Sequence, residues 1–116
     1  MPKRVASDLV PLKPNWFQIL LSVVEGERHG YAIMQEVAER TDGKVRLWPA
    51  TLYGTIRKLE EAQLIEPVQA DPGDEDDERR QYYGITPFGR EVLDAEVQRL
   101  DGLVRLARAR GAGAFQ

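Results

Sequence analysis

The sequence contains no cysteine and only one histidine, His29, among its 116 residues. Without cysteine there can be no disulfide and no thiol catalysis, and a single histidine leaves little from which to build a transition-metal site or a histidine-based proton relay. We therefore expect no enzymatic activity, no metal site and no cofactor.

Long apolar runs are also missing. The longest run, ILLSVV at 19–24, is far shorter than the roughly 20 residues that span a bilayer, and no charged-then-apolar leader with a cleavage site opens the chain. This pattern predicts a cytoplasmic protein. A composition that is 42% hydrophobic and 30% charged is typical of one domain with a modest core.

The acidic residues are unevenly distributed. The net charge is −3, but six acids lie within 71–78, so the rest of the chain is mildly basic. The simplest interpretation of 71–78 is a solvated loop tip, and the alternative is a segment that lowers non-specific affinity for DNA. The negative average therefore does not exclude a polyanionic partner.

Capping signals and apolar spacing predict four helices. The first covers 15–25, with Asn15 as its N-cap, and the second covers 30–41 and stops at Gly43. The third begins at Pro49 and ends before the extended stretch LIEPV. The fourth has Thr86 as its N-cap and ends near Gly111.

Two strand-like runs, LIEPVQA and RQYYGIT, flank the acidic turn and predict a hairpin directly after the third helix. The predicted fold is mainly α with a small β-hairpin wing, a winged helix-turn-helix followed by a long C-terminal dimerisation helix. We assign 1–14 to an N-terminal leader, 15–86 to the winged helix-turn-helix domain, 87–111 to the long C-terminal helix and 112–116 to a tail.

The third helix has a face that does not suit burial. If Leu52, Ile56 and Leu59 point inward, the opposite face and its flanks have small residues at the centre and hydroxyls or cations around them. Such a face suits a helix in the major groove, where small residues permit close approach and polar side chains donate to phosphates and base edges. These residues are Ala50, Thr51, Tyr53, Gly54, Thr55, Arg57 and Lys58. Alternatively, Arg57 and Lys58 form a solvated surface paired with neighbouring glutamates.

The fourth helix has apolar residues at steps of four and three, a rhythm typical of a helix that pairs with another. The most economical partner is a second copy of the chain, and the first helix is apolar on two sides, as it would be if it also met the partner. The expected dimerisation residues are Trp16, Ile19, Val23, Leu93, Val97, Leu100, Val104 and Ala107. An effector pocket between subunits, if there is one, would be walled by Trp16, Phe17 and Leu100.

Three motifs, HGYAI at 29–33, TLYGTIRKLEEAQLI at 51–65 and RRQYYGITPFGREVL at 79–93, resemble those of the PadR family of bacterial winged-helix transcriptional regulators. The resemblance implies a homodimer that binds operator DNA, usually as a repressor, and that a small aromatic effector can release. It also implies a phosphate contact for Tyr53, further contacts for Arg57 and Lys58, and places for Arg79 and Arg80 at the base of the wing. The single C-terminal helix is similar to that of the short subfamily.

Two departures from the family pattern affect these expectations. Trp48 and Ala50 occupy positions that usually hold smaller or glycine-like residues, which bears on base preference. The acidic loop argues against deep insertion of the wing tip into the minor groove. A second function class therefore stays open, a winged-helix module for protein–protein interaction without specific DNA binding.

Overall fold

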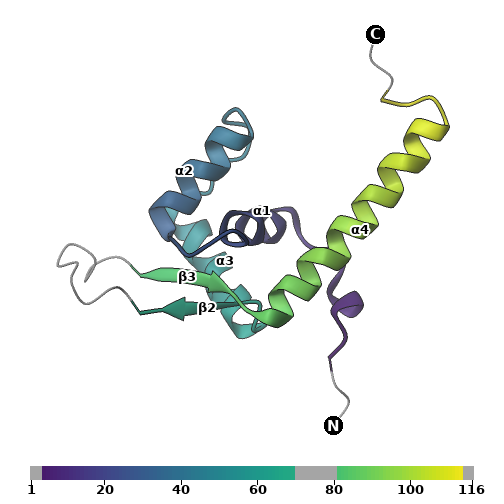
Figure 1. Cartoon of the computed structure of the whole chain (residues 1–116). Coiled ribbons are helices and arrows are strands. Elements are labelled where there is room, and N and C mark those ends of the chain that lie inside the picture. The colour runs from purple at the N-terminus through teal and green to yellow at the C-terminus, as the bar shows by residue number, and fades with distance from the viewer. Residues whose placement is uncertain (1–3, 70–80, 114–116) are drawn as a thin grey trace.

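The computed structural model describes residues 4–69 and 81–113 and has the predicted winged helix-turn-helix architecture (Figure 1). Helices α1 to α3 form the body, the hairpin extends to one side, and α4 projects away from the other (Figure 1). The elements in chain order are the 3-10 helix η1 (Ala6–Leu9), α1 (Pro14–Val23), β1 (Arg28–His29), α2 (Gly30–Arg40), α3 (Pro49–Glu61), β2 (Ile65–Val68), β3 (Tyr82–Ile85) and α4 (Pro87–Ala109).

The sheet has three antiparallel strands in the order β1-β3-β2. In the hairpin Ile65 lies opposite Ile85 and Val68 lies opposite Tyr82, and on the other side of β3 His29 also lies opposite Tyr82. The hairpin was predicted, but β1 was not, because two residues are too few to show the alternation that indicates a strand. Through β1, the sheet is fixed to the start of α2.

The core collects the apolar stripes of the helices together with residues next to β2 and at the start of α4. On α3 the inward residues Leu52, Ile56 and Leu59 are 1%, 1% and 0% exposed, as their spacing predicted. The other buried apolar residues are Leu12, Ile19, Leu20, Val23, Ile33, Val37, Leu47, Leu64, Ile65, Tyr83, Val92 and Leu93. Burial of this continuous cluster fixes the orientation of α3 within the body.

Helix α1 begins one position earlier than predicted. Pro14 occupies its first turn and Lys13 is its N-cap, so the prediction that Asn15 caps the helix was wrong. A proline at the first helical position needs no amide partner there and has a suitable fixed φ. The helix also ends at Val23 instead of residue 25.

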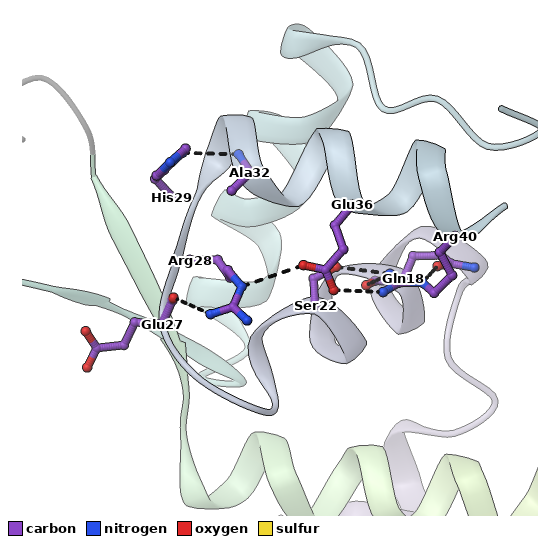
Figure 2. A network of polar contacts seen from close by, with 8 residues as sticks. All are labelled: Gln18, Ser22, Glu27, Arg28, His29, Ala32, Glu36 and Arg40. Carbon is purple, nitrogen blue, oxygen red and sulfur yellow. Dashed lines mark hydrogen bonds and ion pairs between the residues drawn. The ribbon is translucent and has the colours of Figure 1, made fainter. Parts of the chain in front are cut away.

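Polar contacts of Arg40 join α2 to α1 (Figure 2). Its guanidinium donates to Gln18 Oε1 at 3.1 Å, to Ser22 Oγ at 3.0 Å and to Glu36 Oε1 at 3.1 Å. Glu36 also lies 3.6 Å from Arg28 Nε, which extends the network to β1. Several ion pairs and hydrogen bonds that share one arginine hold these elements in one arrangement.

The leader lies against the body and α4. Arg4 donates to the carbonyl of Ala62 at 2.6 Å, at the end of α3, and its guanidinium lies 4.6 Å from the ring centroid of Phe88 on α4. Further along, the amide of Leu12 donates to Glu96 Oε2 at 3.1 Å. The leader thus connects the end of α3 with the first half of α4.

Helix α4 starts as predicted. Thr86 Oγ1 accepts from the amide of Gly89 at 2.8 Å, and Pro87 follows the cap. Gly89 is required because a Cβ there would collide with the carbonyl of Leu64. Since the 23 residues of α4 rise by about 1.5 Å each, the helix is about 35 Å long, and its second half projects beyond the body (Figure 1). Within the described residues, no helix is both long and apolar enough to cross a membrane.

Candidate nucleic-acid interface

Helix α3 presents its polar side to solvent. Pro49 lies in its first turn, as predicted, and Trp48 is its N-cap but makes no capping hydrogen bond with its side chain. Because the inward residues are buried, the opposite side is accessible. We call this side the recognition face, and it comprises Ala50, Thr51, Tyr53, Gly54, Arg57 and Lys58.

The recognition face is shallow at Gly54, which has no side chain, and two cations lie next to this position. A Cβ added at Gly54 would meet nothing within 4 Å, so the surface there is open. Arg57 and Lys58 are exposed and, within the described part of the chain, form no ion pair. The alternative that these two cations are paired with neighbouring glutamates therefore has no support in the structure.

Tyr53 lies against the start of α2. A Cβ at Gly30, the first residue of α2, would be 2.6 Å from Tyr53 Oη, so only glycine leaves room for the phenol in this position. The Tyr53 side chain remains 47% exposed. This half-exposed side chain has its hydroxyl beside the N-terminus of α2, where the peptide dipoles favour an anion.

The start of α2 is fixed by His29. His29 Nδ1 accepts from the amide of Ala32 at 3.1 Å and so caps the helix, as Figure 2 shows. The imidazole also meets the ring of Tyr82 edge to face, with centroids 5.3 Å apart. His29 is thus in contact with both α2 and β3, and it connects the wing to the end of α2 that lies against Tyr53.

Thr55 is less available than the rest of the predicted set. Its hydroxyl donates to the carbonyl of Thr51 at 2.7 Å and is thereby used within α3. Thr51 itself is exposed in the first turn. The two threonines therefore differ in their capacity to contact a ligand.

In the wing, Tyr83 is 7% exposed and belongs to the core, whereas Tyr82 is half-buried against His29. Burial, followed by the nearby charge of Glu60, raises the pKa of the Tyr83 phenol. One tyrosine in the core and one outside agrees with the alternation expected along β3. Arg79, Arg80 and the acidic segment 71–78 lie outside the described residues.

The predicted dimerisation residues fall into two groups. Val97 and Val104 on α4 are 46% and 45% exposed, and Leu100 and Ala107 are half-buried. Leu103 and Leu106, which widen the stripe, are also exposed, at 52% and 45%. By contrast, Ile19, Val23 and Leu93 lie in the core of the protomer, where they are at most 3% exposed.

Of the three residues suggested for an effector pocket, Trp16 borders a cavity of its own. Trp16 is half-buried and lines a cavity together with Lys13 and Lys58, and the lining of that cavity includes neither Phe17 nor Leu100. Phe17 and Leu100 are half-buried as well. In residues 4–69 and 81–113, no group of three or more histidine or acidic side chains could hold a metal ion.

Three features of the site were not predicted. Gly30 and Tyr53 are 23 positions apart in the sequence, and only their two motifs indicated that both positions mattered. Lys13 lines a cavity with Thr55 and Lys58 of α3. Nothing in the sequence indicated this position, because residues 1–14 were predicted to be a leader outside the domain. The buried carboxylate of Glu96 occupies a position on α4 that periodicity does not distinguish from solvent-exposed glutamates.

Comparison with known proteins places this arrangement in a family. Residues 19–95 match the "Transcriptional regulator PadR-like family". A protein of Lysinibacillus sphaericus, named "Uncharacterized protein X", is 36% identical over 80 residues, which cover 69% of this chain and 72% of that protein. An "Uncharacterized 37.1 kDa protein in transposon TN4556" of Streptomyces fradiae is 37% identical over 89 residues, but the match spans only 24% of its length.

Solved structures have the same fold. A PadR family transcription regulator from Clostridium difficile superposes with a TM-score of 0.71 at 20% identity, covering 84% of this chain and 97% of that one. At this identity the likeness concerns the fold alone, while the match over residues 19–95 spans more than half of the chain and includes both helices of the helix-turn-helix. The chain thus belongs to the PadR-like family of transcriptional regulators, which are not enzymes.

Proposed function

We propose that the protein binds a specific operator in double-stranded DNA, with α3 in the major groove, and that it acts as a repressor. The observation that carries the proposal is the recognition face, where the low, open surface at Gly54 lies between exposed Tyr53, Arg57 and Lys58. A low centre permits close approach to base edges, and the surrounding hydroxyl and cations suit phosphates. The two cations are free to do so because neither has an acidic partner among the described residues.

The proposal includes a homodimer formed through α4. Val97, Leu100, Val104 and Ala107 follow the pairing rhythm on the half of the helix that leaves the body, and exposed Leu103 widens this apolar surface. An apolar stripe of this kind on a projecting helix is costly to leave in water. A two-fold dimer would present two copies of α3, so the operator is expected to be pseudo-palindromic with half-sites about one helical turn apart.

The proposal also includes a small aromatic effector. Trp16, Phe17 and Leu100 are each half-buried in the protomer and so keep surface that a second subunit or a small aromatic molecule could cover. Binding of such a molecule between subunits would release DNA if it favoured a different spacing of the two α3 helices.

Selection from a pool of random duplexes, followed by fluorescence anisotropy on the selected and scrambled sequences, tests the proposal. We expect tighter binding to the selected duplex and a linear fall of log affinity with log salt concentration. Equal and weak binding to both duplexes, with no salt dependence, would contradict the proposal and favour the protein–protein interaction module instead.

A further inference from the structure

A cavity of about 340 Å³ opens between the N-terminal end of α1 and the side of α3. It is lined by Lys13, Pro14, Asn15, Trp16, Thr55 and Lys58. Two of these side chains are cations from different elements, and none is a carboxylate. A cavity elsewhere in the body has the opposite character, since it is bordered by Glu25, Glu27 and Glu66.

The two lysines lack a counter-charge of their own. Neither Lys13 nor Lys58 forms an ion pair in the described part of the chain. The ammonium of Lys13 lies 5.8 Å from the ring centroid of Trp16, a cation–π contact that holds it at the cavity wall. Two like charges at one cavity repel each other, and an anion between them removes that repulsion.

The cavity lies on the opposite edge of α3 from Tyr53. Successive residues of a helix are about 100° apart, so Lys58 is turned by about 140° from Tyr53 and Thr55 by about 200°. Tyr53 occupies one edge of the recognition face, beside α2, and Lys58 occupies the other, beside α1. A helix in the major groove has a phosphate backbone along each of its edges, because the groove is bounded by both strands.

We propose that this cavity holds a backbone phosphate of DNA on the strand opposite to the one that Tyr53 contacts. The donors are the ammonium groups of Lys13 and Lys58, with the amide of Asn15 on the same wall. The hydroxyl of Thr55 does not contribute, because it donates to Thr51. This inference rests on the proposed DNA binding and adds the start of α1 to the DNA-binding surface, which had been assigned to α3 and the wing.

Salt-dependent binding tests the inference without knowledge of the operator. The probe is a fluorescein-labelled duplex of mixed sequence, titrated with the full chain at ionic strengths between about 50 and 200 mM. Each phosphate contact contributes about 0.9 to the slope of log affinity against log salt. We expect Lys13→Gln to lower the slope by about this amount, and Lys58→Gln to do the same.

Lys44→Gln is the matched control. Lys44 is exposed like Lys13 but lies beyond the C-terminal end of α2, the end away from Tyr53. It should leave affinity and slope unchanged. Since a phosphate contact carries no sequence information, Lys13→Gln should also weaken selected and mixed duplexes by the same factor.

The outcomes separate the two proposals. If Lys13→Gln keeps the parent's slope of log affinity against log salt while Lys58→Gln lowers it, the start of α1 does not contact DNA and α3 remains the DNA-binding element. An equal loss in Lys44→Gln would overturn the role of α1 too, because the effect would then reflect overall charge. Absence of salt-dependent binding in the parent protein would instead remove the proposed function, and this inference with it.

Discussion

The phenol of Tyr53 occupies the space that a side chain at Gly30 would need. A Cβ at Gly30 would lie 2.6 Å from Tyr53 Oη and 2.9 Å from Cε1 and Cζ. The two residues come from the motifs HGYAI and TLYGTIRKLEEAQLI, so the structure explains why both motifs are needed together. The glycine lets the tyrosine lie along the end of α2 and keeps its hydroxyl at the edge of the recognition face.

Gly30→Ala should displace Tyr53 without unfolding the protein. The Tyr53 ring is the far end of a half-exposed side chain and can swing away, so the free energy of unfolding should change by less than about 1 kcal/mol. Affinity for the selected duplex should fall by about 1.5–3 kcal/mol, the contribution of a hydrogen bond to a charged group. Anisotropy and thermal unfolding measure the two quantities.

A double-mutant cycle identifies the cause. If Gly30 acts by positioning the phenol, Gly30→Ala should have no further effect on affinity in a Tyr53→Ala background. Additive losses in the double variant would mean that Gly30 and Tyr53 act independently, and the positional argument would fail.

Arg57→Ala should weaken binding of the selected duplex by about 1–3 kcal/mol and leave the oligomeric state unchanged. Arg57 is exposed on the recognition face without an ion pair among the described residues, so its loss disturbs no internal contact. Arg110→Ala is the control, because Arg110 is also exposed and forms no ion pair among the described residues, but lies at the far end of α4. If the two variants lose the same affinity, α3 is not the recognition helix.

The sequence predicted the elements whose signals are local. Two helix starts were predicted from residues that favour the first turn of a helix, Pro49 for α3 and Thr86 followed by Pro87 for α4. The structure has both starts as expected. The spacing of Leu52, Ile56 and Leu59 likewise predicted the buried side of α3, from which the recognition face follows.

Contacts between distant positions were not predictable in this way. The folded chain brings together two pairs of distant residues, Gly30 with Tyr53 and Leu12 with Glu96. Neither contact produces a periodic pattern in the sequence. The same limit applies to Ile19 and Val23. Their apolar character was correct, but periodicity does not tell whether an apolar side of a helix faces its own core or a partner, and here both face the core.

Val104→Glu should dissociate the proposed dimer. Val104 is 45% exposed in the protomer, so the substitution leaves the core of the monomer intact. In a dimer the new carboxylate would be buried without a partner, which costs several kcal/mol. Light scattering at micromolar concentration should show a monomer, and operator affinity should fall with it. Gln98→Glu introduces the same charge at an exposed position away from the stripe and should remain dimeric. A dimeric Val104→Glu protein would rule out the α4 interface.

Glu96 should make the stability of the protein depend on pH in the acidic range. The residue is 2% exposed, and its carboxylate accepts from Arg99 at 2.6 and 3.0 Å and from the amide of Leu12 at 3.1 Å. The hydrogen bond from Arg99 lowers the pKa of Glu96 despite its burial, and the bond from Leu12 acts in the same direction.

The sign of the effect follows from this lowered pKa. Because the folded state favours the charged carboxylate, the unfolded chain binds more protons in acid. The stabilisation is therefore fully present above the ordinary glutamate pKa of about 4.3 and is lost as the pH falls through the lower pKa of the folded state.

Glu96→Gln should consequently lower the free energy of unfolding at neutral pH by about 1–3 kcal/mol, since it weakens buried hydrogen bonds to a charged group. The difference in free energy of unfolding between the variant and the parent protein should shrink as the pH falls below about 4.3. At such a pH the carboxylate of the parent protein takes up a proton when the chain unfolds, and this uptake favours unfolding. Urea unfolding across this range measures it. Glu91→Gln makes the same chemical change at an exposed position of α4 and controls for effects unrelated to the buried contacts. A difference for Glu96→Gln that stays constant down to the acid-unfolding range would mean that the charge of Glu96 contributes nothing to the stability of the protein.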